Sequence, residues 1–365
     1  MGIPEKIKKI EEDLKRTQVN KKTEHHIGLL RARLAKLKQE LEEQQQKGGG
    51  SSLGFDVKKS GDASVVLIGL PSVGKSTLLN RLTNAKSKVG AYQFTTLDVV
   101  PGMMEYRGAN IQILDLPGII QGASGGKGLG KRVLSVARSA DMILFVVDVF
   151  QPDARSLLEK ELRSIGIRVD ERPPNIQVEK TNAGGIGVIQ AAKMTKISEK
   201  LVKDIARMYG VNNARIVIRE DISDEQLTDV LLGNRVYIPS LTVMNKIDLV
   251  NSGFINELEQ KLPYKFIPVS AESDININAL KEEIFKKLGF IRVYMKPRGR
   301  EADFEEPMIV RNGSTVLEIC NRLHRNLKDD FRYAMVWGKS VKFAGQKVGL
   351  DHVLMDEDVL TLVTK

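Results

Sequence analysis

The stretch that decides the fold is a glycine-rich turn, and it reads Gly69, Leu70, Pro71, Ser72, Val73, Gly74, Lys75 and Ser76. It has the G-x-x-x-x-G-K-S spacing of a phosphate-binding loop. The apolar residues 64–68 before it predict a buried strand, and residues 77–82 after it predict a helix. In that setting the backbone N–H groups of the turn face a phosphate. Lys75 can then reach the β- and γ-phosphates, and the Ser76 hydroxyl suits Mg²⁺.

A second motif discriminates between adenine and guanine nucleotides. Asn245, Lys246 and Asp248 form an N-K-x-D that directly follows the apolar residues 237–244. An aspartate there can accept hydrogen bonds from the N1–H and 2-amino groups of guanine, a donor pair that adenine lacks. Lys246 would lie along the base, and Asn245 would tie this loop to the phosphate loop. The motif disfavours an ATP-dependent enzyme and predicts a GTP-binding protein.

Two segments predict the γ-phosphate side of the site. Asp115 follows the predicted strand 110–114, and its carboxylate would hold Mg²⁺ through a water molecule. Gly118, three residues further on, would donate its N–H to the γ-phosphate. The segment 94–98 supplies Thr96, whose hydroxyl would complete the magnesium shell. Adjacent threonines are also ordinary strand residues, so this segment argues for a switch only together with the other motifs.

The last motif concerns the base. Ser270, Ala271 and Glu272 follow the predicted strand 266–269 and would place backbone N–H groups at guanine O6. Lys75, Thr96 and Gly118 form the predicted catalytic set, and Ser76, Thr96 and (through water) Asp115 the magnesium set. The nucleotide-binding set is Gly69, Leu70, Pro71, Ser72, Val73, Gly74, Lys75, Ser76, Thr77, Phe94, Thr95, Thr96, Asp115, Leu116, Pro117, Gly118, Asn245, Lys246, Asp248, Ser270, Ala271 and Glu272.

The residue after Gly118 is informative because it is not a glutamine. Ras-type enzymes use a glutamine there to orient the attacking water. Here the position is Ile119, whose aliphatic side chain makes no hydrogen bond to water, and Gln121 lies two residues beyond it. The glycine-rich residues 121–130 are expected to move in the absence of nucleotide, as a second switch. Intrinsic hydrolysis should therefore be slow, on the order of 10⁻⁴ to 10⁻² per second.

The motifs G-L-P-S-V-G-K-S, F-T-T-L, D-L-P-G-I-I-Q-G-A and N-K-I-D together resemble the Obg-related translation-factor GTPases, and most of all the developmentally regulated GTP-binding (DRG) family. The resemblance covers essentially the whole chain. It implies a GTPase that hydrolyses GTP to GDP and phosphate and works with the ribosome or translating RNA. Several related GTPases bind K⁺ through an asparagine at the position of Ser72. A serine hydroxyl is a weaker oxygen ligand for K⁺ than an asparagine side chain. The predicted cofactors are therefore GTP or GDP and Mg²⁺, with K⁺ left as an open alternative.

Composition sets the class of protein. The chain has 365 residues, a net charge of +10 and a single cysteine, Cys320. The lone cysteine lies in a helical pattern, where a small buried apolar role is expected, and it predicts a cytoplasmic protein. No apolar run approaches the roughly eighteen residues of a membrane span. The excess of basic over acidic residues favours RNA or the ribosome as a partner. A solvated surface rich in Lys and Glu, which is common in heat-adapted proteins, is an alternative explanation of the charge.

Four modules are expected along the chain. Residues 1–57 form a helical hairpin and linker, because apolar residues recur at helical spacing on both sides of a break near residue 20. Residues 58–289 form an Obg-type G domain with a doubly wound α/β sheet. It contains an α+β insertion at 168–235, in the place where the DRG family carries a ribosomal-protein-like segment. Residues 290–365 resemble a TGS β-grasp domain.

A rival hypothesis from another class remains. The chain could be an RNA-binding scaffold in which bound nucleotide is mainly structural. Under either hypothesis, the accessory modules offer surfaces to a regulatory protein partner. A change in RNA or ribosome affinity between nucleotide states would separate the two, because a scaffold predicts none.

Overall fold

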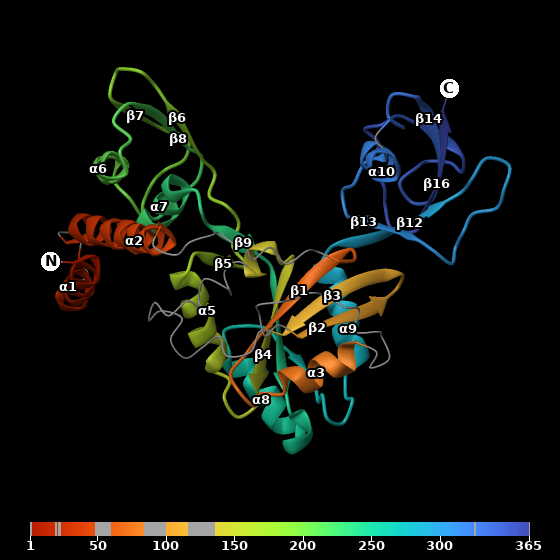
Figure 1. Ribbon diagram of the computed structural model, residues 1–365, viewed down its shortest axis with the longest axis horizontal. Coiled ribbons are helices and arrows are strands. Elements are labelled where there is room, and N and C mark those ends of the chain that lie inside the picture. Colours follow the sequence, from red (N-terminus) through yellow and green to blue (C-terminus); the bar gives the residue numbers. More distant parts are fainter. Residues whose placement is uncertain are drawn as a thin grey trace. The chain divides into compact units, whose positions relative to one another are not determined.

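The structure is a computed structural model that describes residues 2–18, 20, 23–47, 60–83, 100–115, 136–324 and 326–364. The chain divides into two compact units: residues 1–54 with 171–237, and residues 55–170 with 238–365 (Figure 1). The short strands β5 (Ile167–Val169) and β9 (Val236–Ile238) lie where the chain passes from one unit to the other. Within the described ranges, no helix has the length and hydropathy to cross a membrane.

A six-stranded sheet organises the larger unit, in the order β11-β10-β4-β1-β3-β2. Strand β2 is antiparallel to β3, and all other neighbours are parallel. Central parallel strands are buried on both faces, which explains why the sequences of β1 and β4 are almost continuously apolar. The six strands are β1 (Ala63–Ile68), β2 (Val100–Tyr106), β3 (Ala109–Asp115), β4 (Met142–Asp148), β10 (Ser240–Asn245) and β11 (Ile267–Pro268).

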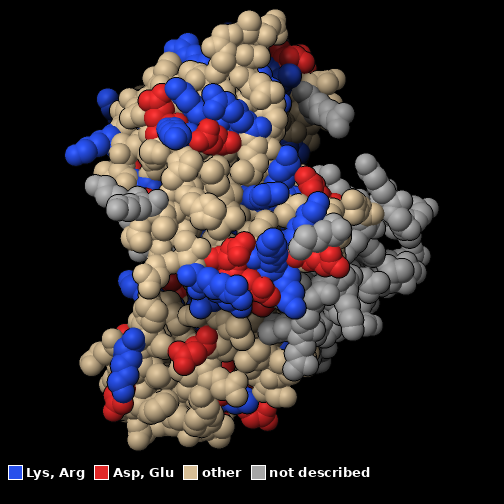
Figure 2. Space-filling model, turned by 90° about the vertical axis from the view of Figure 1, so that its left-hand side faces the viewer, with Lys and Arg blue, Asp and Glu red and all other residues tan. Residues whose placement is uncertain are grey.

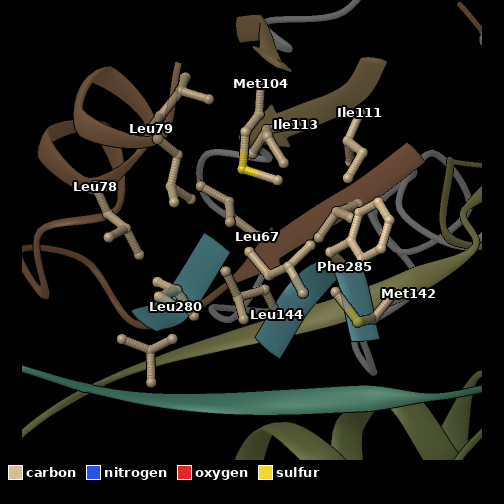
Figure 3. Close-up of a cluster of buried hydrophobic side chains, with 14 of the residues drawn as sticks. Leu67, Leu78, Leu79, Met104, Ile111, Ile113, Met142, Leu144, Leu280 and Phe285 are labelled. Carbon is tan, nitrogen blue, oxygen red and sulfur yellow. The ribbon is translucent and has the colours of Figure 1, made fainter. Parts of the chain in front are cut away.

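Helices cover both faces of this sheet. On one face, Leu67 and Leu144 pack with Leu78 of α3 and Leu280 of α9 (Figure 3). On the other face, the guanidinium of Arg155 in α5 lies over the ring of Phe145, a residue of β4. The predicted doubly wound α/β architecture is thus confirmed. The helices are α3 (Lys75–Leu82), α5 (Ala154–Ser164), α8 (Ser252–Lys261) and α9 (Ile277–Lys287), with the 3₁₀ turn η1 (Ile247–Leu249).

The C-terminal part is a mixed five-stranded sheet crossed by one helix, as expected of a β-grasp domain. Its order is β13-β12-β16-β14-β15, and α10 (Val316–Leu323) buries Cys320 against it. Burial raises the pKa of the Cys320 thiol. His352 has a structural contact, with its Nε2 atom 2.9 Å from the Ser340 hydroxyl. The strands are β12 (Phe290–Met295), β13 (Met308–Arg311), β14 (Phe331–Trp337), β15 (Gln346–Val348) and β16 (Asp358–Thr364).

The smaller unit joins the N-terminal helical hairpin to the inserted segment. Ala32 of α2 lies in one hydrophobic core with Val202 of α6 and Ile216 of β8. The Tyr209 hydroxyl donates to the backbone oxygen of Ala32 at 2.8 Å. The sheet has the order β6-β8-β7. The elements are α1 (Ile3–Arg16), α2 (Glu24–Lys47), β6 (Ile176–Lys180), β7 (Ile186–Gln190), α6 (Glu199–Met208), β8 (Ala214–Ile218) and α7 (Asp224–Leu232).

Side-chain caps define where two helices of this unit begin. Ser223 and Gln226 form a reciprocal capping box at the start of α7, and the helix ends at Gly233 in the left-handed conformation. Helix α6 starts after Ser198, whose side chain accepts from the Leu201 N–H.

Candidate functional site

The phosphate loop connects β1 to α3 at the carboxyl edge of the six-stranded sheet. Its backbone enters the left-handed region twice, at Ser72 (φ 62°) and at Gly74 (φ 90°). Only Gly74 is free of the steric cost of this conformation, and a Cβ atom there would collide with the side-chain amide of Asn245. A non-glycine residue held in this region, as Ser72 is, is typical of functional loops. The loop is therefore shaped by close backbone approaches rather than by a bulky side chain.

Lys75 lies folded back over this loop. Its ammonium donates to the backbone oxygens of Gly69 at 3.0 Å and Leu70 at 2.9 Å. Burial lowers the pKa of this ammonium, while the carboxylate of Asp115 opposes the shift. The two backbone oxygens hold the ammonium inside the loop, where a phosphate oxygen can replace them as acceptors.

Ser76 and Asp115 provide the oxygen atoms of a magnesium site. The Ser76 hydroxyl donates to Oδ2 of Asp115 at 2.9 Å, which brings the start of α3 to the end of β3. Asp115 is 3 % exposed, and its other oxygen, Oδ1, is buried without a hydrogen-bond partner among the described residues. A buried carboxylate oxygen of this kind needs a donor or a cation. A hydroxyl and a carboxylate are the hard ligands that Mg²⁺ prefers, so these residues fit the ion.

Asn245 connects the phosphate and base sides of the site. It ends β10 and is 3 % exposed. Its amide nitrogen donates to the backbone oxygen of Val73 at 2.8 Å, and its amide oxygen accepts from the Ala271 N–H at 3.0 Å. One side chain thus joins the phosphate loop, the N-K-x-D turn and the segment at 270–272.

Lys246 and Asp248, the other two polar residues of the motif, are less buried than Asn245. Lys246 adopts the left-handed conformation (φ 67°), and its ammonium forms an ion pair with Asp148 at 2.6 Å. Asp248 lies in η1 and is exposed. An exposed carboxylate at the carboxyl edge is available to a ligand, whereas the apolar neighbour Ile247 is buried.

Asp148 is a residue of this site that the motifs did not identify. It ends β4, the strand that pairs directly with β10. Besides the ion pair with Lys246, its carboxylate accepts a hydrogen bond from the Phe150 N–H at 3.0 Å. Its carboxylate fixes the Lys246 side chain that is expected to lie along the base. The signal was available, because a polar residue that ends a buried parallel strand lies at the ligand-binding edge.

The remaining predicted site residues divide by what the structure describes. Ser270 and Ala271 are buried, and Glu272 is exposed next to them. Thr77 is half-buried in the first turn of α3. The others lie outside the described residues: Phe94, Thr95, Thr96, Leu116, Pro117, Gly118, Ile119 and the glycine-rich residues 121–130. The described residues alone bring the phosphate, magnesium and base motifs to one edge of one sheet.

Three family models match the chain in succession. Residues 64–180 match the 50S ribosome-binding GTPase model, and residues 183–290 match the C-terminal region of that MMR_HSR1 domain. Residues 291–364 match the TGS domain. Together these matches cover both the sheet that carries the site and the C-terminal β-grasp domain.

Relatives extend over the full chain. An uncharacterized GTP-binding protein of Methanocaldococcus jannaschii is 54 % identical over 100 % of this chain and 94 % of its own length. Developmentally-regulated GTP-binding protein 2 of Homo sapiens is 46 % identical over 100 % of both chains. The chain therefore belongs to the family of developmentally regulated GTP-binding proteins, P-loop GTPases with a C-terminal TGS domain.

Proposed function

We propose that this GTP-binding protein hydrolyses GTP to GDP and phosphate slowly, and that the exchange between the two states switches its affinity for the ribosome or its RNA. The observation that carries the proposal is the double contact of Asn245, which ties the phosphate loop to the segment at 270–272. A site built this way can couple the phosphates to the base. The name of the matching family model, a 50S ribosome-binding GTPase, supports a ribosomal partner.

The chain's own residues divide the chemistry of hydrolysis. Lys75 would bear the negative charge that develops on the transferred phosphoryl group as water attacks in line. Ser76, Asp115 and, from the sequence, Thr96 would hold Mg²⁺, which supplies further positive charge when bound. The Gly118 N–H would meet the γ-phosphate. With Ile119 in place of a glutamine, no side chain at that position orients the water, so we infer the slow rate given above.

Base recognition would fall to the exposed carboxylate of Asp248. It would accept from guanine N1–H and the 2-amino group, while Lys246 lies along the ring and the segment 270–272 offers backbone N–H groups to O6. The Lys246–Asp148 ion pair supports this role, because it limits the orientations of the lysine. Whether K⁺ assists at Ser72 is decided by comparing hydrolysis in K⁺ and in Na⁺.

The accessory modules would carry the partner contact. We propose a hairpin and linker at 1–57, a G domain at 58–289 with an insertion at 168–235, and a TGS domain at 290–365, in a cytoplasmic protein. Figure 2 shows that, among the described residues of this face, Lys and Arg lie in separate groups that also contain Asp and Glu. The net charge of +10 still favours a polyanionic partner.

Sedimentation of the full chain with ribosomes tests the switch. Binding is measured with a GTP analogue, with GDP and without nucleotide, each across a salt series. A switch predicts unequal binding in the nucleotide states. Phosphate contacts predict a log–log salt slope near −0.7 to −0.9 per phosphate neutralised. Equal binding in all states would favour the scaffold, and salt-independent binding would indicate a protein partner.

A further inference from the structure

Arg81 lies in the last turn of α3, the helix that begins in the phosphate loop. Its side chain ends on the segment at 270–272. Its Nε donates to the backbone oxygen of Ala271 at 3.0 Å, and its Nη2 donates to that of Glu272 at 2.9 Å. One guanidinium therefore holds two successive carbonyl groups, and its planar fork keeps both donors in a fixed relation.

The backbone N–H groups of the same segment show which donor is free for a ligand. Within the described part of the chain, the Glu272 N–H has no acceptor. The other N–H groups are used internally: Ser270 donates to the backbone oxygen of Ile275 (3.2 Å), Ala271 to Oδ1 of Asn245 (3.0 Å) and Ser273 to Oγ of Ser270 (3.0 Å). A base oxygen can thus be met by the Glu272 N–H without breaking any of these bonds.

Peptide geometry links this donor to Arg81. The carbonyl of Ala271 and the N–H of Glu272 belong to one planar trans peptide, in which they point in opposite directions. Holding the carbonyl therefore fixes the direction of the N–H. We propose that Arg81 is a positioning residue of the base site. It orients the peptide between Ala271 and Glu272 so that this N–H meets the 6-oxo group of guanine.

Asn245 makes a second contact that holds the segment at 270–272. That side chain fixes the Ala271 N–H and reaches the backbone oxygen of Val73 in the phosphate loop. Arg81 fixes the next peptide and belongs to the helix that the phosphate loop starts. One clamp thus reaches the phosphate loop, and the other starts from the helix that follows this loop. The inference rests on the proposed guanine site, and it adds Arg81 as the residue that orients the Glu272 N–H.

Equilibrium binding to the full-length chain with Mg²⁺ tests the role of Arg81. The ligands are GDP, ADP and the diphosphate of 2-aminopurine riboside, a base without a 6-oxo group. The variants are Arg81→Ala, Arg81→Lys and the control Asn80→Ala, an exposed neighbour on the same helix. Loss of one oriented hydrogen bond should weaken GDP binding to Arg81→Ala by about 5- to 30-fold. Binding of the 2-aminopurine nucleotide should change by less than about twofold.

The other arms separate the possible outcomes. Arg81→Lys should recover part of the GDP affinity, because an ammonium can reach one of the two carbonyls, and Asn80→Ala should match the wild type. Equal losses for GDP and the 2-aminopurine nucleotide in both Arg81 variants would make Arg81 a general brace of the fold and overturn the inference. Unchanged GDP affinity would overturn it too. A wild-type chain that binds GDP no more tightly than ADP would instead remove the guanine site itself.

Discussion

The two compact units use similar polar contacts in different ways. In the nucleotide-binding unit, Lys75 and Asn245 bond to backbone groups of loops. In the unit built from 1–54 and 171–237, Lys36 of α2 donates to the backbone oxygen of Met208 at 2.7 Å, and Arg31 pairs with Asp224 at 3.5 Å. These latter contacts hold one helix to another.

This difference shows where function can be inferred from the structure. Loop-directed contacts fix backbone groups at the carboxyl edge of a sheet, where a ligand can use them. Helix-to-helix contacts stabilise a shape and identify no ligand by themselves. The first prediction below changes one member of each class.

The largest effect is expected at Lys75. Lys75→Ala removes the charge that would stabilise the phosphoryl group, so hydrolysis should fall by about 10²- to 10³-fold or more, with weaker GTP binding. Lys36→Ala removes an ammonium that also donates to a backbone oxygen, but in the other unit, and it should leave hydrolysis unchanged. Single-turnover assays with a magnesium titration measure both. Full activity in Lys75→Ala would show that the loop is not the catalytic site.

A somewhat smaller effect is expected from Asp248→Asn. The amide replaces one acceptor by a donor, so the affinity for GTP should fall by about 10²-fold. The affinity for xanthosine triphosphate should rise, because its base has an oxygen at C2 that can accept from the amide. Competition binding among GTP, ATP and XTP measures the change. Asp351→Asn, an exposed aspartate of the C-terminal domain, is the matched control. If the Asp248 variant kept full GTP affinity, the base would be recognised elsewhere.

Much of the nucleotide-binding unit could be predicted from the sequence, because its features are local. The strand before Gly69 and the strand that leads to Asp115 are apolar runs, each followed directly by a nucleotide-binding motif. The structure confirms both strands. Asp148 and Arg81 were missed, because their partners lie 98 and 190 positions away along the chain. No spacing rule relates residues that only the sheet order brings together.

The smaller unit was predicted less completely. The α+β class of the insertion could be predicted, but β7 is hard to recognise, because Gly184, Gly185 and Gly187 weaken the strand pattern around it. Nor could periodicity decide what the apolar stripe of α2 packs against. The burial of Ala32 with the inserted segment is a long-range contact that follows from neither sequence pattern alone.

An intermediate effect, confined to stability, is expected at Ala32. This side chain is 1 % exposed, so Ala32→Leu overfills the contact between α2 and the insertion and should lower the unfolding free energy by about 1–3 kcal/mol. GTP hydrolysis should not change. Arg33→Leu, at an exposed position of the same helix, is the control. Denaturation followed by circular dichroism measures the shift. This substitution is cleaner than deleting 1–47, which would remove Ala32 and expose the core of the insertion.

The smallest effect is expected at Ile119, which lies outside the described residues. Because an aliphatic side chain donates no hydrogen bond to water, Ile119→Ala should slow hydrolysis by less than about tenfold, or under about 1.4 kcal/mol of barrier. Single-turnover hydrolysis at saturating GTP, with GTP affinity measured separately, isolates the chemical step. The comparison with Lys75→Ala matters most here, because the sequence motifs predict that both residues lie near the γ-phosphate. A loss as large as that of Lys75→Ala at unchanged affinity would mean that Ile119 shapes the path of the attacking water.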